Sequence, residues 1–244
     1  MMRRFLAALS FLTIVPVRLH DDDFPTLLTR SVWWFPVVGL LIGCWCAGMR
    51  SIVEPVLSPS VDAVVCVALL AAAHGGFHLD GLADTADGCA APVDRTRALE
   101  IMRDSRVGTF GVLALMLCLG LKVAAIGDMS ATRVPWALVT AAVSGRSAVL
   151  LVPAMLPPAR PDGLGRLFAE ACGWKTVVYA LAIAAAVGWL GLGGFGMAAV
   201  SAAAVGTGVA AMAAYRRLGG FTGDILGAVS ELSETIVLVV CAVR

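Results

Sequence analysis

The sequence predicts an all-α, polytopic integral membrane protein: a bundle of about six or seven transmembrane helices forming one membrane-embedded domain over residues 1–244. Two observations of composition point this way. The chain is 59% hydrophobic and 14% charged, whereas soluble domains are about 45–50% apolar and about 25% charged. Its mean hydropathy is +0.90. A third observation is that the apolar residues gather in runs of about 20, the length that crosses a bilayer as a helix. The lipid bilayer is therefore an expected partner.

Eight segments account for most of the chain. The opening MMRRFLAALSFL is basic and then apolar, with no small-residue cleavage site before Pro16, and predicts a retained helix that lies on the membrane surface or is partly inserted. The apolar runs cover residues 31–50, 61–79, 108–127, 134–156, 176–193, 196–214 and 224–243. The fifth and sixth meet at GLGGFG, which is typical of a tight turn. Their many Gly, Ala and Ser residues allow close helix contacts, within one protomer or between protomers of a homo-oligomer.

The basic residues are distributed unevenly between the two predicted ends of the bundle. If the N-terminus is cytoplasmic, thirteen Lys and Arg residues fall in the inside segments. Only Arg50, Arg133 and Arg244 fall outside, and Lys122 and Arg146 lie within spans. This places the loop 80–107 and the turn 215–224 at the cytoplasmic face. The net charge of +1 argues against a polybasic nucleic-acid binder, so no nucleic-acid partner is expected.

The stretch FHLDGLADTADG at 77–88 carries three aspartates beside a predicted span. If the helix continues through residue 87, Asp80, Asp84 and Asp87 lie within about 60° on one face. Such carboxylates repel unless a cation lies between them. Oxygen-only ligands at a cytoplasmic face favour Mg²⁺, and the flanking Gly81 and Gly88 would let a ligand approach closely. The alternative is a solvated helix end, which would normally mix both signs of charge. By contrast, the contiguous acidic run at 21–23 is expected to be a solvated loop.

The next polar stretch, EIMRDSRVGTFG at 100–111, precedes the third span. Arg103 and Arg106 suit phosphate oxygens, and Asp104 adds a carboxylate. Gly108 and Thr109 open the helix, where backbone N–H groups favour an anion. The alternative is an ordinary positively charged inside loop.

Charged residues also occur within the apolar runs. Arg146 lies inside AAVSGRSAVLL, and Asp224 and Glu231 are two turns apart in GGFTGDILGAVSELSE. Buried charges are costly and need partners. Two interpretations stay open: Arg146 pairs with Glu231 or Glu234, or a carboxylate here binds metal or acts as a base.

His74 and His78 are four residues apart. On a straight helix they point about 120–160° away from the aspartates. A packing or hydrogen-bonding role is therefore favoured over metal binding, with His78 able to reach substrate if Gly75 and Gly76 bend the helix.

Together, these carboxylates, arginines and glycine turns predict a Mg²⁺-dependent transfer of a phosphate-containing group. One substrate would be membrane-held, and a carboxylate would take the proton of an attacking hydroxyl.

The motifs GGFHLDGLADTADG, EIMRDSRVGTFGVLAL and GGFTGDILGAVSELSE, in this order, resemble the cobalamin synthase family, the adenosylcobinamide-GDP ribazoletransferases. The N-terminal FLTIVPV is similar to that family's opening F-L-T-x-x-P-V. The D-x-x-D-G core of DTADG also resembles the CDP-alcohol phosphotransferases.

The resemblance implies a bacterial cytoplasmic (inner) membrane enzyme with its active site on the cytoplasmic face. It would transfer the cobinamide-phosphate group of adenosylcobinamide-GDP to α-ribazole or α-ribazole 5′-phosphate, release GMP and require Mg²⁺. The implied metal ligands are Asp80, Asp84, Asp87, Asp104, Asp224 and Glu231, with Asp87 or Asp104 as the catalytic base. The implied substrate and phosphate contacts are His78, Arg103, Arg106, Gly108, Thr109, Arg146, Thr222 and Gly223.

Two rival functions remain. A CDP-alcohol phosphatidyltransferase would show D-G-x-x-A-R, but CAAPVD follows Asp87-Gly88 here. A cation-coupled transporter would use the intramembrane charges, although the acidic residues gather at one predicted face and no repeat is visible.

Overall fold

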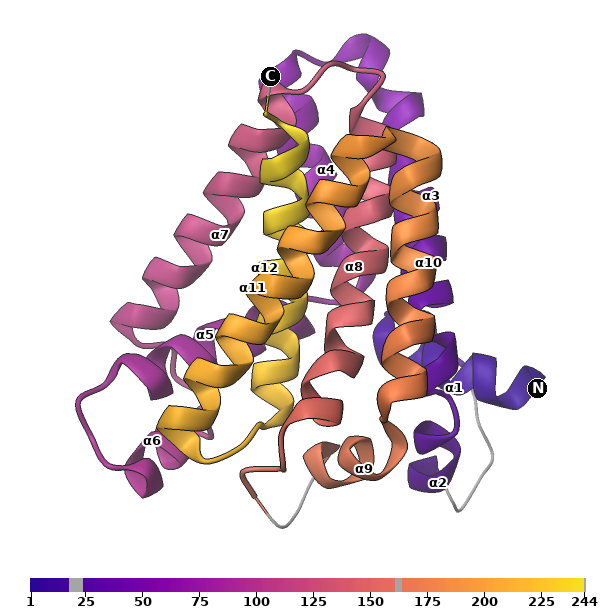
Figure 1. Ribbon diagram of the computed structural model, residues 1–244. Helices are drawn as coiled ribbons and strands as arrows, with labels where there is room; N and C mark the ends of the chain where they lie inside the picture. The colour runs from indigo at the N-terminus through magenta and orange to yellow at the C-terminus, as the bar shows by residue number, and fades with distance from the viewer. Residues whose placement is uncertain (18–23, 161–163, 244) are drawn as a thin grey trace.

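The computed structural model describes residues 1–17, 24–160 and 164–243, and their regular structure is helical (Figure 1). The acidic run at 21–23 lies outside the described residues, as do Arg18 and Arg244. In chain order the helices are α1 (Met2–Leu12), α2 (Phe24–Thr29), η1 (Val32–Trp34), α3 (Phe35–Val53), η2 (Glu54–Val56), α4 (Pro59–Ala73), α5 (Phe77–Ala90), α6 (Arg95–Ile101), α7 (Thr109–Asp128), α8 (Val134–Met155), α9 (Leu164–Ala171), α10 (Trp174–Leu192), α11 (Gly194–Leu218) and α12 (Gly223–Cys241).

Five of these segments are long and apolar enough to cross a membrane, or six if α4 and α5 count as one bent span. They are Val32–Val56, α7, α8, α10 and α11. Among them α8 is the most deeply buried, and in Figure 1 it stands in the middle of the bundle. These five segments match five of the seven predicted runs, so the polytopic helical fold is confirmed. Of the other two runs, 61–79 is broken between α4 and α5, and 224–243 forms α12, which is not among the five.

α12 runs beside α8 and α11 through the bundle and buries most of its residues (Figure 1). Its three acidic residues, Asp224, Glu231 and Glu234, make it more charged than the five apolar spans. The structure therefore encloses α12 among other helices, which is where a charged helix can find partners.

Small residues set the distance between the central helices. A Cβ at Gly39 of α3 would lie 2.7 Å from the carbonyl oxygen of Ala142 in α8, and one at Gly43 would lie 2.5 Å from the Cα of Val139. The two backbones are thus in direct contact, as small-x-x-x-small patterns permit in membranes.

The second predicted span differs from expectation. The helix does not continue through residue 87: it breaks after Ala73, and α5 leaves α4 at an angle of 91°. Gly75 (φ 62°) and Gly76 (φ 77°) provide the left-handed backbone conformation that this turn requires. Beyond the turn, α5 does not continue along the bundle but lies across its end, near α6 (Figure 1).

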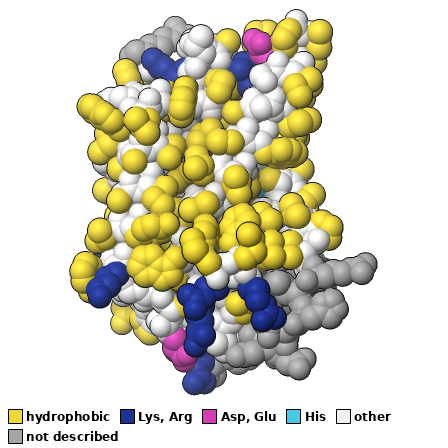
Figure 2. All heavy atoms as spheres, turned by 90° about the vertical axis from the view of Figure 1, so that its right-hand side faces the viewer, with side chains coloured by type: hydrophobic (Ala, Val, Ile, Leu, Met, Phe, Trp, Pro, Cys, Tyr) yellow, Lys and Arg dark blue, Asp and Glu magenta, His cyan; other side chains and the backbone are white. Residues whose placement is uncertain are grey.

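The two ends of the bundle have distinct chemistry. On the face shown in Figure 2, hydrophobic side chains cover the middle, and basic side chains gather at the ends, most of them at the lower one. The loops around α6 and α9 and the turn between α11 and α12 all lie at this lower end, opposite the C-terminus (Figure 1). The loops predicted to share one membrane face therefore do so.

Arginines at the lower end join these loops to one another. Arg217 of α11 donates to the carbonyl oxygens of Cys89 and Ala91 at the C-terminus of α5, at 3.2 and 2.7 Å. Arg95 donates to the carbonyl oxygen of Ala159 (2.9 Å), and Arg160 to that of Leu99 (2.8 Å). Cationic donors suit the carbonyl end of a helix, so several of the basic residues predicted here have a structural role.

Candidate active site

Close packing of α5 on α12 creates the site. A Cβ at Gly81 would lie 2.7 Å from the carbonyl oxygen of Asp224, and one at Gly227 would lie 3.2 Å from the Cα of His78. The space beside Gly81 is thus filled by α12, and that beside Gly88 by Met102 and Ala98. The expectation that these two glycines leave room for a ligand was wrong, because neighbouring chain segments occupy the room.

The packing brings together four carboxylates, here called the aspartate cluster: Asp80, Asp84 and Asp87 of α5, and Asp224 of α12. Asp80 is exposed and Asp84 half-buried. Burial, together with the charges of Asp80, Asp224 and Asp87, raises the pKa of Asp84 to about 6, against the opposing effect of Arg160. Like charges close together disfavour ionisation, so the structure places Asp84 in electrostatic reach of Asp80, Asp87 and Asp224. That these four side chains bind a metal stays a prediction.

Thr222 fixes the first turn of α12. Its hydroxyl donates to Oδ2 of Asp224 (3.1 Å) and accepts from the N–H of Ile225 as the helix N-cap (3.4 Å). Gly223 is next to it, and no heavy atom lies within 4 Å of where its Cβ would be. Thr222 therefore orients Asp224, and Gly223 leaves open space beside it.

Asp87 is held by the N-terminus of α7. Its Oδ2 accepts from the N–H of Gly108 (2.7 Å) and its Oδ1 from the N–H of Gly111 (2.9 Å). The N-terminus of a helix favours an anion, as predicted, but here the anion is a carboxylate of the chain itself rather than a substrate phosphate. Thr109 is exposed at the first position of α7.

Asp104 does not join the aspartate cluster. Its carboxylate accepts from Nε (3.0 Å) and Nη2 (2.6 Å) of Arg106, and this pairing holds the pKa of Asp104 at about 2. Both side chains are in the exposed connection between α6 and α7. Arg103, from the same connection, interacts electrostatically with Asp224. The structure thus brings Arg103 to the predicted site, whereas Arg106 is bound to Asp104.

Glu231 is placed in a second group of charges, inside the bundle. Lys122 of α7 lies between two carboxylates of α12, with its Nζ 2.6 Å from Oε2 of Glu231 and 2.6 Å from Oε2 of Glu234. The other oxygen of Glu234 pairs with Arg146, and Oε1 of Glu231 is 3.2 Å from Nε2 of His74. All five side chains are almost completely buried. We call them the buried charge network.

This network decides between the two interpretations of the intramembrane charges. Arg146 pairs with Glu234, which is the structural alternative, and Glu231 is about 10 Å along α12 from Asp224, given a rise of about 1.5 Å per residue. Neither Arg146 nor Glu231 therefore lies with the aspartates as predicted for a phosphate contact and a metal ligand. Sequence analysis missed Lys122, although a lysine within a span is itself a signal that a buried acid is near.

His78 also lies away from the aspartates. Its ring stacks on that of His74 with the centroids 4.7 Å apart, and its Nδ1 is buried without a hydrogen-bond partner. Within the described residues, His74, His78 and Glu231 are the one set of three ligand-type side chains whose donor atoms lie within 4.8 Å of one another.

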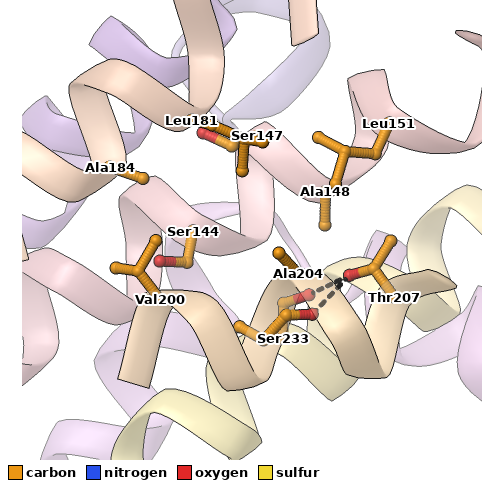
Figure 3. Close-up of a pocket in the computed structure, with 11 residues that line it drawn as sticks. Ser144, Ser147, Ala148, Leu151, Leu181, Ala184, Val200, Ala204, Thr207 and Ser233 are labelled. Atoms are coloured by element: carbon orange, nitrogen blue, oxygen red, sulfur yellow. Dashed lines mark hydrogen bonds between the residues drawn. The ribbon is translucent and has the colours of Figure 1, made fainter. Parts of the chain in front are cut away.

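A small pocket inside the bundle lies between α8, α10, α11 and α12 (Figure 3). Its polar lining consists of hydroxyl groups, and Thr207 and Ser233 bond to each other across it at 2.8 Å. Thr207 also donates to the carbonyl oxygen of Ala203 (2.9 Å). This hydrogen bond joins α11 to α12. No ionisable side chain lines the pocket, so it lacks the acid–base groups of a reaction site.

Comparison with known proteins identifies the family to which the chain belongs. A family model described as cobalamin-5-phosphate synthase matches residues 4–242. The chain belongs to the cobalamin-5-phosphate synthase family. Similar members of known name are adenosylcobinamide-GDP ribazoletransferases from Geotalea daltonii (40% identical, covering 98% of this chain and 96% of the relative) and Klebsiella pneumoniae subsp. pneumoniae (41%, 98% and 98%). One from Bradyrhizobium diazoefficiens is 39% identical over 96% of this chain and 91% of its own. No solved structure matches the chain significantly.

Membership of the cobalamin-5-phosphate synthase family confirms the resemblance drawn from the three motifs. The relatives named above carry neither rival name, and the intramembrane charges that suggested a cation-coupled transporter are paired with one another. The relatives are named as transferases, in agreement with the predicted class of enzyme.

Proposed function

We propose that the protein transfers the cobinamide-phosphate group of adenosylcobinamide-GDP to α-ribazole or its 5′-phosphate, at the aspartate cluster. The observation that supports this site is the convergence of Asp80, Asp84 and Asp87 on Asp224, at the arginine-rich end of the bundle. Carboxylates from two helices, with Arg103 and Arg160 acting on Asp224, suit a phosphate-bearing substrate and its counter-ion. The names of the relatives support the substrate pair.

The donor set fits Mg²⁺. The four side chains offer only hard oxygen atoms. Burial and then the charges of its three neighbours raise the pKa of Asp84, and a bound cation would relieve the part that comes from repulsion. Their oxygens do not converge as tightly as the donor atoms of His74, His78 and Glu231. We infer that a bound Mg²⁺ is coordinated by only some of Asp80, Asp87 and Asp224. Its remaining coordination positions are then open to water or phosphate oxygens. When bound, Mg²⁺ would neutralise the diphosphate and the departing GMP.

The chain itself supplies the proton acceptor. Of the two predicted bases, only Asp87 belongs to the cluster, and two backbone N–H groups hold it in place. Burial and the charges of its neighbours raise the pKa of Asp84 to about 6, close to the neutral range where a general base works best. We therefore propose Asp84 as the base. The ribazole hydroxyl gives its proton to Asp84, its oxygen forms a bond to the cobinamide-side phosphorus, and the bond from that phosphorus to the oxygen of GMP breaks.

The distribution of arginine also indicates the cellular location of the protein and its orientation in the membrane. We propose that the arginine-rich end faces the cytoplasm from a bacterial inner membrane, because basic loops stay inside. A nucleotide substrate and released GMP would then meet the cluster in the cytoplasm, with the bundle anchored in the bilayer.

The test is GMP release by purified protein in lipid nanodiscs supplied with adenosylcobinamide-GDP and α-ribazole or its 5′-phosphate. We expect Mg²⁺-dependent release with formation of the joined product, and a loss of at least about 100-fold in Asp84→Asn, as removal of a general base produces. Asp128→Asn makes the same chemical change at the exposed far end of α7 and should leave activity intact. Inactive wild type in a folded state would overturn the reaction, and fully active Asp84→Asn would overturn the site.

A further inference from the structure

We propose that His74, His78 and Glu231 form a second metal site, buried behind the aspartate cluster, that takes a borderline transition-metal ion such as Zn²⁺. The donor atoms of the three side chains lie within 4.8 Å of one another. Two imidazoles and a carboxylate are a ligand set that zinc uses, whereas Mg²⁺ prefers oxygen alone. This site does not depend on the proposed reaction.

Two of the three side chains carry a buried atom without a hydrogen-bond partner. They are Nδ1 of His78 and Oε1 of Glu231. Buried polar atoms are nearly always satisfied, and leaving one unpaired costs about 1–3 kcal/mol. Nδ1 of His78 is buried without a partner, and Oε1 of Glu231 has only Nε2 of His74 beside it, at 3.2 Å. Both atoms can therefore offer a lone pair to a cation.

The spacing agrees with a shared ion. Ligands at about 2.0–2.2 Å from a tetrahedral zinc stand roughly 3.3 Å apart, and Nε2 of His74 is 3.2 Å from Oε1 of Glu231. This contact lies within ion-pair range, yet Oε1 of Glu231 has no partner with hydrogen-bond geometry. The backbone N–H of His78 donates a long hydrogen bond (3.5 Å) to Nδ1 of His74, which leaves Nε2 of that ring facing Glu231.

Three separate elements hold the ligands in place. His74 ends α4, directly before the two left-handed glycines, and His78 lies in the first turn of α5, with its backbone against Gly227. Glu231 comes from the buried middle of α12, where Lys122 holds its other oxygen at 2.6 Å. An outer partner of this kind orients a ligating carboxylate. A bound ion would therefore fasten the α4–α5 break to α12.

The experiment uses full-length protein without a histidine tag, stripped with chelator and kept in millimolar Mg²⁺ so that hard-oxygen sites are occupied. Co²⁺, followed by its visible absorption, and competing Zn²⁺ are the probes. We expect one equivalent to bind. His74→Gln and Glu231→Gln should each weaken binding by more than the ~10–100-fold typical of losing an outer-shell partner.

Two controls separate this site from other donors. Asp84→Asn alters the aspartate cluster, and Cys118→Ala removes a thiol whose sulfur lies 4.0 Å from Glu231; both should bind Co²⁺ as the wild type does. Unchanged binding in His74→Gln, or loss in Asp84→Asn, would overturn the assignment.

A measurement on the wild type alone covers the case in which the variants do not fold. X-ray absorption of the Zn²⁺-loaded protein should show imidazole nitrogen and oxygen around zinc, and no sulfur. Absence of zinc binding, or a coordination shell without imidazole, would show that these residues form only an ion pair and a stacked histidine pair.

Discussion

At the scale of single residues, the site depends on contacts that leave no room for a methyl group. A Cβ at Gly111 would overlap Oδ2 of Asp87 and lie 3.1 Å from the carbonyl oxygen of Ala83. The same carboxylate accepts hydrogen bonds from Gly108 and Gly111. The backbone N–H groups of the two glycines thus position Asp87, and the absence of a side chain at each gives its carboxylate the space that it occupies.

Gly111→Ala should therefore displace Asp87 and strongly reduce transferase activity, with a stability loss of about 1–3 kcal/mol from overpacking. Gly120→Ala is the matched control, because it lies on the same helix with nothing within 4 Å of its Cβ. Activity and thermal unfolding of both variants in detergent would check this. Equal activity in the two would show that Asp87 need not be held as observed.

Asp84 sets the expected pH dependence. Asp84 works as a base when deprotonated, so kcat/KM should fall about tenfold per pH unit below its pKa. That pKa is about 6 without metal, and Mg²⁺ bound by the neighbouring aspartates lowers it, so the break in the profile should lie below pH 6. Asp80→Asn removes one of the neighbouring charges that raise this pKa, so the break should move to lower pH. Rate profiles of wild type and Asp80→Asn, each at saturating Mg²⁺, test the assignment. If kcat/KM falls at the same pH in Asp80→Asn as in the wild type, the assignment of Asp84 as the base is contradicted.

At the scale of elements, the bend between α4 and α5 determines where the aspartates lie. Had the helix continued straight, Asp80, Asp84 and Asp87 would follow the axis of α4. Instead Gly75 and Gly76 turn α5 by 91°, so that it lies against the first turn of α12.

Gly76→Ala tests the bend, since its φ of 77° is left-handed and no heavy atom lies within 4 Å of its Cβ position. The substitution adds backbone strain alone, and we expect a loss of about 1–2 kcal/mol. Gly76→Asn should recover part of it, because asparagine tolerates this conformation better. Chemical denaturation of the three proteins measures the difference, and equal losses in Ala and Asn would point to another cause.

The buried charge network joins α7, α8 and α12 and balances two cations against two carboxylates. Lys122→Met leaves one carboxylate uncompensated, and breaking such a pair typically costs about 3–5 kcal/mol. Adding Glu231→Gln restores the balance, so the double variant should lose less than the sum of the single ones. Arg97→Met, which breaks the exposed pair with Glu100, should cost less than about 1 kcal/mol. Additive losses at Lys122 and Glu231 would contradict the network.

At the scale of the whole molecule, one end of the bundle carries the aspartate cluster, the proposed reaction site, and the other end does not. The aspartate cluster lies at the end with α6 and α9, and Asp128 closes α7 at the opposite end (Figure 1). Whether protomers associate through the Gly- and Ala-rich helix faces stays a prediction.

Orientation in the membrane can be tested directly. In a variant lacking the natural cysteines, a cysteine at Asp128 should react with a membrane-impermeant thiol reagent in right-side-out vesicles. One at Glu100 should react only after permeabilisation, since basic loops stay inside. The reverse pattern would place the aspartate cluster on the other side of the membrane.

The sequence by itself determined the helical membrane fold, the positions of the spans and the family. These features are local: each depends on a run of about 20 apolar residues or on an uninterrupted motif. It also placed the aspartates at one end of the bundle, because loop charge and motif position are read along the chain. It did not determine which helix each polar group faces.

Tertiary structure decided those partners. In the folded protein, Asp87 accepts hydrogen bonds from the N-terminus of α7, and Asp104 pairs with Arg106. Glu231 lies beside Lys122 and His74 rather than among the aspartates. The chain also turns between α4 and α5 at Gly75 and Gly76, and a hydropathy pattern does not detect this turn. The physical reason is that packing sets the partner of a buried charge. Lys122 meets Glu231 and Glu234 across 109 and 112 positions of the chain, and only the folded bundle brings these residues together.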